Sequence, residues 1–543
     1  MDHKCPAYEF SPKGKRTAGA GMYKDSTITS AQHKRMRRRR RSILHLCIGI
    51  IALASCTGKM VSLVPDSPSK APDYFCTWNT QGYVVSYSGS DMMRSAMTEE
   101  NIFGSGQYQN WVQFFPKIRK DLYFVMDDSW DIPQDENSAH RNPYLGLCEL
   151  DEGRFSSFRG TPAERLRQLT TRIKQEGWKG AGGWICAQKA GSYKHQSEEE
   201  YWSERLKAAA CAGFSYWKVD WGHQDRNENW RRMLTDLGRK YAPELWIEHA
   251  MNGHFIRFSD VFRTYDVENI IAQPLTIRRV AELLPYKTEG ENKGLINCED
   301  EPYIGVGLGC AIGIMRHPMD GNLPDGRQDE VFPPVGHNYK RCMEEVVRAV
   351  RWHRIAEPFG VDGNYEADTV MLTDYWVLHE NETWNKGRQT GTTLRESAPA
   401  RVSRNMPLPI VDDQSDERPY ILCSTYPTGA IAISAIGRAI GRQYICKEVA
   451  VTAHAKDWYA PIGLFGYFKE VCLLYPDTIR KRDKHSPKVL AQDLAGDSPI
   501  DISTEVTIEG NRLIIPGEVI RRVGLMASSA DDLSAPGLVI RIR

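Results

Sequence analysis

The chain has 543 residues, a length typical of roughly two to four domains. Hydrophobic residues make up 41% and charged residues 26%, which is ordinary for a globular protein. The formal net charge of +1 gives no electrostatic case for binding nucleic acid. Aromatic residues make up 10%, including 14 tryptophans, which fits either stacking on sugars or a large core.

Residues 1–56 have the features of an export signal. A basic run at Arg37–Arg41 precedes the apolar stretch Ile43–Ala54, which is too short to cross a membrane as a helix. The following Cys56 closes Leu-Ala-Ser-Cys, which resembles a bacterial lipobox, so Cys56 is the predicted lipidation site. A plain secretory signal or a buried segment is the alternative, and Met22 and Met36 are alternative starts.

The prediction is therefore an exported outer-membrane lipoprotein that contacts the membrane only through its lipid. Thr57, Gly58 and Lys59 contain no acidic run of the kind that directs surface display, which favours the periplasmic side. Residues 57–72, with several Ser, Pro and Lys, are predicted to be a linker.

Thirteen cysteines occur, and none forms a CxxC pair or a Cys/His array with the spacing of a zinc site. Several lie in apolar runs, where a free cysteine behaves as a small hydrophobic residue. We therefore expect no metal and no disulfide framework, although one or two bridges would fit an exported protein.

Strand-like and helix-like segments alternate from residue 73 to residue 356. The predicted strands are Tyr74–Trp78, Leu122–Met126, Gly180–Cys186, Ser215–Val219, Leu245–Ile247, Val261–Tyr265, Gly294–Cys298 and Ala311–Met315. The predicted helices include Thr161–Glu176, Glu198–Cys211, Trp230–Tyr241, Pro274–Leu284 and Tyr339–Ile355. This alternation predicts a (β/α)8 TIM barrel over residues 73–356. The alternative, a doubly wound open sheet, requires a Gly-rich phosphate loop after the first strand, and the sequence has none there.

Acidic residues follow the predicted strands at or just past their ends. They are Asp127, Asp128, Asp220, Glu248, Asp266, Glu299 and Asp300. In a barrel these positions surround one mouth, which is where barrel enzymes have their active sites.

From residue 357 to residue 543 the pattern changes to short β-type runs separated by turn residues. Examples are Val370–Leu378, Tyr420–Ser424, Ala430–Ser434, Val471–Tyr475 and Leu513–Ile515. An antiparallel β-sandwich packed against the barrel is the predicted structure.

Tyr216–Gly222 is the most informative segment, because it places Lys218 and Asp220 two residues apart on one strand. Side chains two apart in a strand share a face. The cation beside the carboxylate favours the ionised form that a nucleophile needs. A solvated strand end with a salt bridge is the alternative.

Glycoside hydrolysis needs two carboxylates flanking one bond, and Asp220 and Asp266 end the fourth and sixth strands.

Three motifs resemble glycoside hydrolase clan D, the α-galactosidase group, most closely families 27 and 36. The Lys-x-Asp motif matches Lys218-Val219-Asp220, and the Asp-Asp-x-Trp motif matches Asp127-Asp128-Ser129-Trp130. Arg263-Thr264-Tyr265-Asp266-Val267 resembles the strand-six motif. The clan combines a (β/α)8 barrel with a β-sandwich, and it uses a nucleophile on strand four and an acid/base on strand six.

The resemblance implies a role for each matched residue. Asp220 is the implied nucleophile and Asp266 the implied acid/base. The implied sugar ligands are Asp127, Asp128, Trp130, Lys218, Arg263, Trp78 on strand one and Glu248 on strand five. Arg263 stands three residues before Asp266, whereas many relatives leave four, and the strand-seven sequence does not align securely with the clan pattern.

Each assignment has a structural alternative that the sequence leaves open. Asp127 and Asp128 can be a helix-capping pair, and Asp266 can form an ion pair with Arg263. Glu248 is either a sugar ligand or a buried partner of Lys218. Trp184 and Trp221 fit sugar stacking and core packing equally well, and His317 is expected to be structural.

The expected function is that of a retaining exo-glycosidase that cleaves terminal α-galactosyl residues from an oligosaccharide or polysaccharide, without metal or cofactor. Within the enzyme class, β-L-arabinopyranosidase and α-N-acetylgalactosaminidase activities are alternatives. A glycan-binding lipoprotein on an inactive barrel, or other chemistry on the same fold, are the alternatives from other classes. The oligomeric state stays open.

Overall fold

The computed structural model describes residues 60–137, 142–264, 270–329, 331–332, 335–379, 382, 389–479 and 487–543. The predicted export signal with Cys56, and the predicted acid/base Asp266, lie outside these residues. Within the described residues, no helix is both long and apolar enough to cross a membrane.

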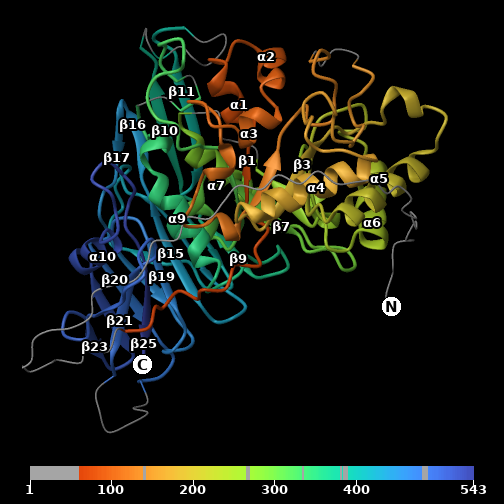
Figure 1. Cartoon of the computed structure of the whole chain (residues 1–543). Coiled ribbons are helices and arrows are strands. Elements are labelled where there is room, and N and C mark those ends of the chain that lie inside the picture. The colour runs from red at the N-terminus through yellow and green to blue at the C-terminus, as the bar shows by residue number, and fades with distance from the viewer. Residues whose placement is uncertain are drawn as a thin grey trace, which may run out of the picture. The chain divides into compact units, whose positions relative to one another are not determined.

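Eight parallel strands close into a barrel in chain order, each strand pairing with the next and β8 pairing with β1 (Figure 1). They are β1 (Tyr74–Cys76), β2 (Tyr123–Met126), β3 (Gly180–Ile185), β4 (Tyr216–Val219), β5 (Trp246–His249), β6 (Val261–Arg263), β7 (Leu295–Glu299) and β8 (Ala311–Ile314). The predicted TIM barrel is confirmed, and every predicted strand coincides with one of these strands. The first strand ends at Cys76, earlier than predicted, and Trp78 begins a helix.

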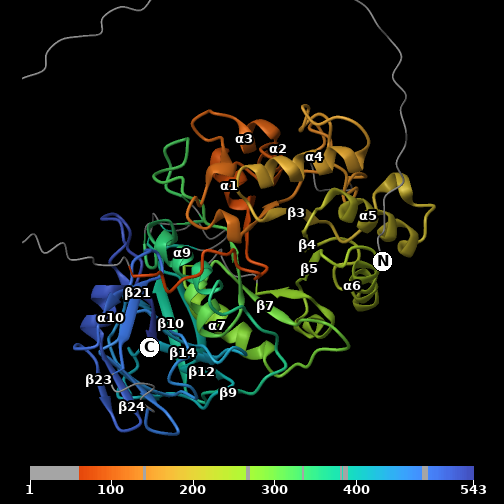
Figure 2. The ribbon, with the colours of Figure 1, turned by 60° about the horizontal axis from the view of Figure 1, so that its bottom comes forward.

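Helices connect the strands and cover the barrel, as Figure 2 shows for α4, α5 and α6 outside β3, β4 and β5. The helices are α1 (Trp78–Val84), α2 (Ser90–Ser95), α3 (Glu99–Phe103), α4 (Pro162–Gln175), α5 (Glu198–Ala212), α6 (Glu228–Tyr241), α7 (Ala272–Leu283), α8 (Pro302–Gly307), α9 (Met343–Trp352) and α10 (Gly517–Gly524). Short 3-10 turns occupy Trp111–Gln113, Arg119–Asp121, Gly191–Tyr193, Gly253–Phe258 and Tyr339–Arg341.

Local signals set the ends of the helices that lead into β3 and β4. Thr161 and Glu164 form a reciprocal capping box at the start of α4, and Ser197 and Glu200 do the same for α5. Gly213 ends α5 with φ of 67°, a conformation that glycine adopts without the steric cost of a Cβ. The chain can therefore turn at once into β4 and bring Lys218 and Asp220 to the barrel mouth.

The C-terminal part contains three sheets. Their strands are β9 (Tyr365–Ala367), β10 (Met371–Val377), β11 (Thr393–Pro399), β12 (Arg401–Arg404), β13 (Ile410–Val411), β14 (Tyr420–Thr425), β15 (Ile431–Ile436), β16 (Arg438–Gly441), β17 (Gln443–Ile445), β18 (Ala450–His454), β19 (Ile462–Phe465), β20 (Glu470–Leu474), β21 (Val489–Asp493), β22 (Ile500–Asp501), β23 (Thr507–Glu509), β24 (Arg512–Pro516) and β25 (Gly537–Ile542). The sheet orders are β11-β10-β16-β17, β22-β21-β25-β19-β15-β14-β12-β9 and β13-β18-β20-β24-β23.

The predicted β-sandwich is confirmed as a pair of packed sheets, but the strands are not all antiparallel. The pairs β10–β16, β12–β14, β15–β19 and β18–β20 are parallel. Apolar runs such as Ile431–Ile436 do not reveal strand direction, because a strand buried on both faces has no alternation to read.

The central strands of the eight-stranded sheet, such as β14 and β15, are buried on both faces. Successive side chains along each strand point to opposite faces and so enter different cores. Ile421 and Ile433 face a core shared with the five-stranded sheet, whereas Leu422 and Ala432 belong to the core that continues into the barrel. Helices α8 and α9 contact this sheet. Residues 60–543 therefore form one compact unit.

Residues 60–72, the described part of the predicted linker, are packed rather than free (red in Figure 1). Leu63 and Val64 are buried, and the Leu63 amide donates to Gln492 Oε1 at 2.6 Å. The Ser69 amide donates to Asp121 Oδ1 at 2.8 Å. The serines and prolines indicated a linker, but two apolar residues are enough to hold the segment against the folded unit.

An ion pair between α9 and β21 joins the barrel to the sandwich. Arg348 Nε lies 2.9 Å from Asp493 Oδ1, and the two side chains are 0% and 2% exposed. Arg351, on the same helix, pairs at 2.6 Å with Asp497, whose side chain is 86% exposed.

We expect Asp493→Asn to lower the free energy of unfolding by about 3 kcal/mol, because it leaves the buried guanidinium of Arg348 without its charge partner. Asp497→Asn is the matched control, and it should cost less than about 1 kcal/mol because the Asp497 carboxylate is exposed to solvent. Denaturant unfolding of both variants checks the expectation. Equal losses would mean that the buried pair does not hold the two parts together.

Candidate active site

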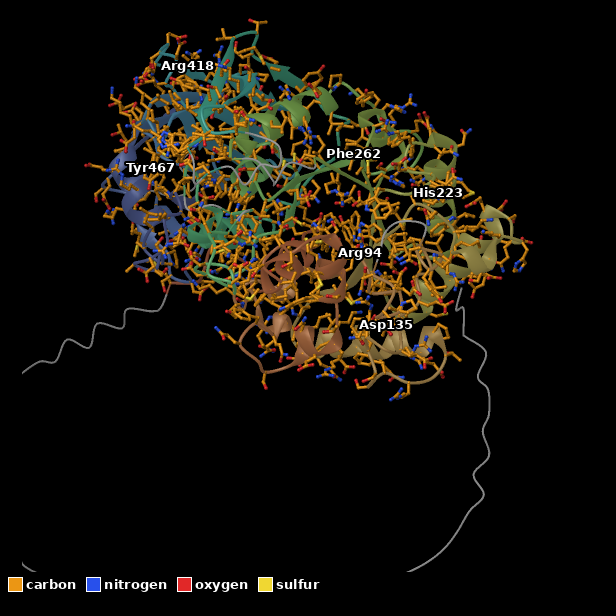
Figure 3. All side chains as sticks on the ribbon, turned by 90° about the horizontal axis from the view of Figure 1, so that it is seen from above. Arg94, Asp135, His223, Phe262, Arg418 and Tyr467 are labelled. Atoms are coloured by element: carbon orange, nitrogen blue, oxygen red, sulfur yellow. The ribbon has the colours of Figure 1, made fainter. Side chains whose placement is uncertain are left out.

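The candidate site lies where strands β2, β4, β6 and β7 end, because parallel strands present their carboxyl ends at one rim of a barrel. Figure 3 labels Arg94, His223 and Phe262 in this part of the molecule, and Arg418 and Tyr467 in the sandwich. Arg94 comes from α2, His223 from the loop after β4, and Phe262 from β6.

Asp220 follows β4 directly, and each of its carboxylate oxygens accepts a hydrogen bond. Arg263 Nη2 donates to Oδ1 at 3.1 Å, and Trp184 Nε1 donates to Oδ2 at 2.9 Å. Arg231 Nη2 donates to the Asp220 carbonyl at 2.7 Å. The carboxylate is thus held in one orientation from neighbouring strand β3 and from β6, while its side chain keeps 9% exposure.

Lys218 shares the face of Asp220, as predicted, but its ammonium group pairs with a different carboxylate. Lys218 Nζ lies 2.9 Å from Asp127 Oδ2 and 3.3 Å from Cys76 Sγ. The cation that contacts Asp220 is Arg263. Burial alone would lower the pKa of Lys218, yet the Asp127 carboxylate keeps that pKa well above its usual value.

Asp127 and Asp128 lie side by side after β2, but their environments differ. Burial opposes ionisation of Asp127, and the neighbouring Lys218 outweighs it and lowers the Asp127 pKa. Burial raises the pKa of Asp128 to about 6, although Arg94 Nε donates to its Oδ2 at 2.8 Å. No described helix uses either carboxylate as its N-terminal cap, so the capping alternative is not realised in this part of the chain.

Glu248 lies at the end of β5 inside the barrel and is 0% exposed. It accepts hydrogen bonds from Arg263 Nη1 at 3.0 Å, Tyr216 Oη at 2.8 Å and Asn297 Nδ2 at 2.6 Å. The structure therefore places Glu248 beneath Arg263, where it fixes the guanidinium that contacts Asp220. The alternative partner considered for it, Lys218, is on the adjacent strand but pairs with Asp127.

Glu299, at the end of β7, is a site residue to which the sequence assigned no role. Its carboxylate lies 3.8 Å from Lys218 Nζ and 3.7 Å from Arg263 Nε. Burial raises the pKa of Glu299 to about 7, against the effect of the two cations. The sequence places Glu299 among the acidic residues at the strand ends, which was the available sign of a site residue. Its contacts with Lys218 and Arg263 depend on the register of the strands, which the sequence does not give.

The tryptophans divide into packing and positioning residues. Trp130 is 1% exposed, and its Nε1 donates to the Trp184 carbonyl at 2.9 Å, so it packs in the core instead of facing the mouth. Trp78 is half-buried at the start of α1, against the cluster that contains Tyr74 and Cys76. Trp184 orients Asp220, a role that the sequence did not reveal.

His317 is fully buried after β8, and its ring packs edge-on against Tyr83 with centroids 4.8 Å apart. This position agrees with the structural role expected for it.

A cavity of about 770 Å³ is lined by the loops that follow β2, β3 and β4, and its wall begins at Trp221, the residue after Asp220. Trp221 forms part of its wall, and the ring of Trp221 lies 5.3 Å from that of Trp184. The polar lining includes Lys189 and His223. An aromatic face with polar groups around it can stack on a sugar ring and bind its hydroxyls.

No protein-family model and no curated protein matches the chain. Among solved structures, α-galactosidase I from Mortierella vinacea is 12% identical over 87% of this chain and 96% of that chain, with a TM-score of 0.35. A family 27 β-L-arabinopyranosidase from Geobacillus stearothermophilus, in complex with arabinose, is 8% identical over 88% and 97%, with a TM-score of 0.38. An α-amylase from Anoxybacillus is 8% identical over 87% and 97%, with a TM-score of 0.39. At these identities the likeness concerns the fold alone.

Glu299→Gln should change how stability depends on pH. Between the ordinary pKa of a glutamate and about 7, the folded protein keeps a proton on Glu299 that the unfolded chain has released. Stability from this group is therefore present at low pH and is lost as pH rises through 7. From pH 5 to pH 8, the wild type should lose about 2 to 3 kcal/mol more unfolding free energy than Glu299→Gln.

Denaturant unfolding at the two pH values measures this difference. Glu282→Gln, an identical substitution at an exposed position of α7, should keep the wild-type dependence. Parallel pH dependences of Glu299→Gln and the wild type would contradict the assignment.

Proposed function

We propose that the chain is a retaining glycoside hydrolase that releases terminal α-galactosyl residues, with Asp220 as nucleophile and Asp266 as acid/base. The observation that carries the proposal is the Asp220 carboxylate, fixed by Arg263 and Trp184 at the mouth of a barrel. A nucleophile that must attack one carbon benefits from such fixed orientation. The cavity lined by Trp221 offers space for the rest of the glycan.

In the proposed reaction, an Asp220 oxygen attacks the anomeric carbon while Asp266 protonates the leaving glycosidic oxygen. The bond from carbon to the leaving oxygen breaks, and an ester to Asp220 forms. Asp266 then removes a proton from water, which attacks the same carbon and releases Asp220. Two inversions retain the configuration of the sugar.

The buried charges around Asp220 support binding of a sugar. Asp127 and Asp128 are oriented by Lys218 and Arg94, and carboxylate oxygens accept more than one hydrogen bond. Both carboxylates can therefore accept bonds from sugar hydroxyls without giving up these partners. Two of the three hydrogen bonds of the Lys218 ammonium group go to sulfur atoms, which are weak acceptors, so a sugar hydroxyl can replace one of them.

Asp220→Ala should lower turnover of an aryl α-galactoside more than about a thousandfold, because the first covalent step is lost. Azide should restore turnover and yield a β-galactosyl azide, since it attacks once from the face that Asp220 vacates. The product is identified by nuclear magnetic resonance.

Asp236→Ala is the matched control, because Asp236 is exposed on α6 and should keep wild-type turnover. Full activity of Asp220→Ala would refute the nucleophile. If the wild type cleaves the aryl β-L-arabinopyranoside or α-N-acetylgalactosaminide in preference to the aryl α-galactoside, the proposed substrate changes to that sugar and the proposed mechanism is unaffected. Binding of galactosides without any turnover would favour the glycan-binding alternative.

Trp184→Phe should lower kcat/KM about 10- to 100-fold, because it removes one hydrogen bond to a charged group worth about 1.5 to 3 kcal/mol. KM should change little and the unfolding temperature should stay close to that of the wild type. Trp458→Phe, in the sandwich, serves as the control with unchanged kinetics. Unchanged kcat/KM in Trp184→Phe would mean that the indole does not position Asp220.

A further inference from the structure

A second cavity, of about 330 Å³, lies between the barrel and the sandwich and contains none of the residues assigned to the candidate active site. One wall is the segment that enters α9, and the opposite wall is formed by the sandwich around β16 and β17. The lining residues used below are His337, Cys342, Glu345, Gly437, Tyr444 and Cys446.

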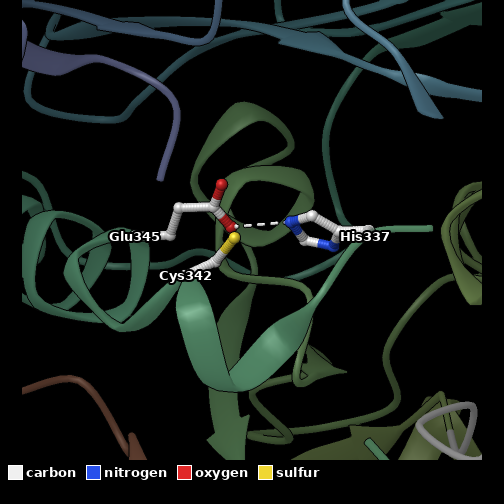
Figure 4. Close-up of side chains that lie close together, drawn as sticks. All are labelled: His337, Cys342 and Glu345. Atoms are coloured by element: carbon white, nitrogen blue, oxygen red, sulfur yellow. Dashed lines mark ion pairs between the residues drawn. The ribbon is translucent and has the colours of Figure 1, made fainter. Parts of the chain in front are cut away.

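Three of the lining side chains, which differ in their chemistry, lie close together, as Figure 4 shows. His337 Nε2 lies 3.4 Å from Glu345 Oε2, with the two side chains 8% and 7% exposed. The donor atoms of His337, Cys342 and Glu345 all lie within 4.8 Å of one another. An imidazole, a thiol and a carboxylate this close form a set of metal ligands.

The backbone explains why these three side chains meet. Cys342 is the residue before α9 and Glu345 lies in its first turn, three residues later, so the two share one helix face. The His337 ring is placed by Tyr444, which stacks on it with centroids 5.1 Å apart and planes 24° apart. The Nδ1 atom of His337 has no hydrogen-bond partner among the described residues. No hydrogen bond at Nδ1 therefore fixes the tautomer of the imidazole ring.

We infer that His337, Cys342 and Glu345 bind a zinc-class divalent transition metal. Zinc bonds of about 2.0 to 2.3 Å place tetrahedral ligand atoms roughly 3.3 to 3.8 Å apart. The His337–Glu345 distance already falls in this range, and the widest spacing needs a contraction of about 1 Å, within reach of side-chain rotation. Thiolate and imidazole ligands select zinc or a similar ion over calcium and magnesium.

Cys446 completes the proposed site as its fourth ligand from the sandwich side, and its thiol lies outside the group of three donor atoms within 4.8 Å of one another. It lies at the exposed rim of the same cavity, directly after β17. A Cβ on Gly437 would lie 2.9 Å from Cys446 Sγ, so the thiol already occupies the space over that glycine. With two sulfurs, one nitrogen and one oxygen, the closed site would clip the start of α9 to the β16–β17 hairpin.

The test uses the full-length protein, stripped of metal with a chelator and then titrated with Zn²⁺ and Co²⁺. We expect one Zn²⁺ per chain, a rise in unfolding temperature on loading, and a thiolate-to-metal charge-transfer band with Co²⁺. Cys342→Ser should weaken the band, because one of the two thiolates is lost, and should weaken Zn²⁺ binding at least tenfold. Cys446→Ser should leave a weaker band, since one thiolate remains.

Cys211→Ser, an exposed cysteine on α5, is the matched control and should keep both band and affinity. His337→Gln provides a second variant should Cys342→Ser fold poorly, and it should lose Zn²⁺ affinity while the fold is kept. Absence of Zn²⁺ binding by the wild type, or a Co²⁺ band of unchanged intensity in Cys342→Ser, would overturn the site. A Cys342–Cys446 disulfide found by peptide mapping of the purified protein would also overturn it.

Discussion

The Arg263 guanidinium holds the candidate active site together, because it contacts Asp220 and Glu248 at the same time. Its side chain is 0% exposed, so a buried positive charge is stable there only while its carboxylate partners remain. Glu248, in turn, is fixed by Tyr216 from the adjacent strand β4 and by Asn297 from β7 across the barrel interior. The orientation of Asp220 is thus set by hydrogen bonds that run across the barrel interior.

The charges around this arginine do not balance, and the imbalance has a visible consequence. Two buried cations, Lys218 and Arg263, face the carboxylates of Asp127, Asp220, Glu248 and Glu299. Closely spaced buried carboxylates cannot all ionise at neutral pH. Burial is the main cause of the raised pKa of Glu299, and the nearby carboxylates of Glu248 and Asp300 add to it. A sugar, which is neutral and rich in hydroxyl groups, can bind in such a site without adding charge.

Sequence reasoning predicted the barrel and the Lys218–Asp220 face correctly, since both depend on local alternation along the chain. It could not predict that Arg263 pairs with Asp220, because their strands are not adjacent and the pairing depends on the closed barrel. The inward packing of Trp130 likewise depends on Gly183, whose missing side chain leaves room for the indole. The sequence did not predict the cluster of His337, Cys342 and Glu345, because the spacing of these residues is not that of a zinc motif. The proposed fourth ligand, Cys446, is about a hundred residues away in the chain.

The central claim is that Asp220 forms a covalent bond to the substrate. A galactosyl fluoride carrying a second fluorine at C5 slows hydrolysis of the ester more than its formation, so the glycosyl-enzyme accumulates. Peptide mapping by mass spectrometry after such a reaction locates the bond. We expect one added 5-fluorogalactosyl group on the peptide that contains Asp220, with the anomeric fluoride released. A label on another residue, or no label with a substrate that is turned over, would contradict the role of Asp220 as nucleophile.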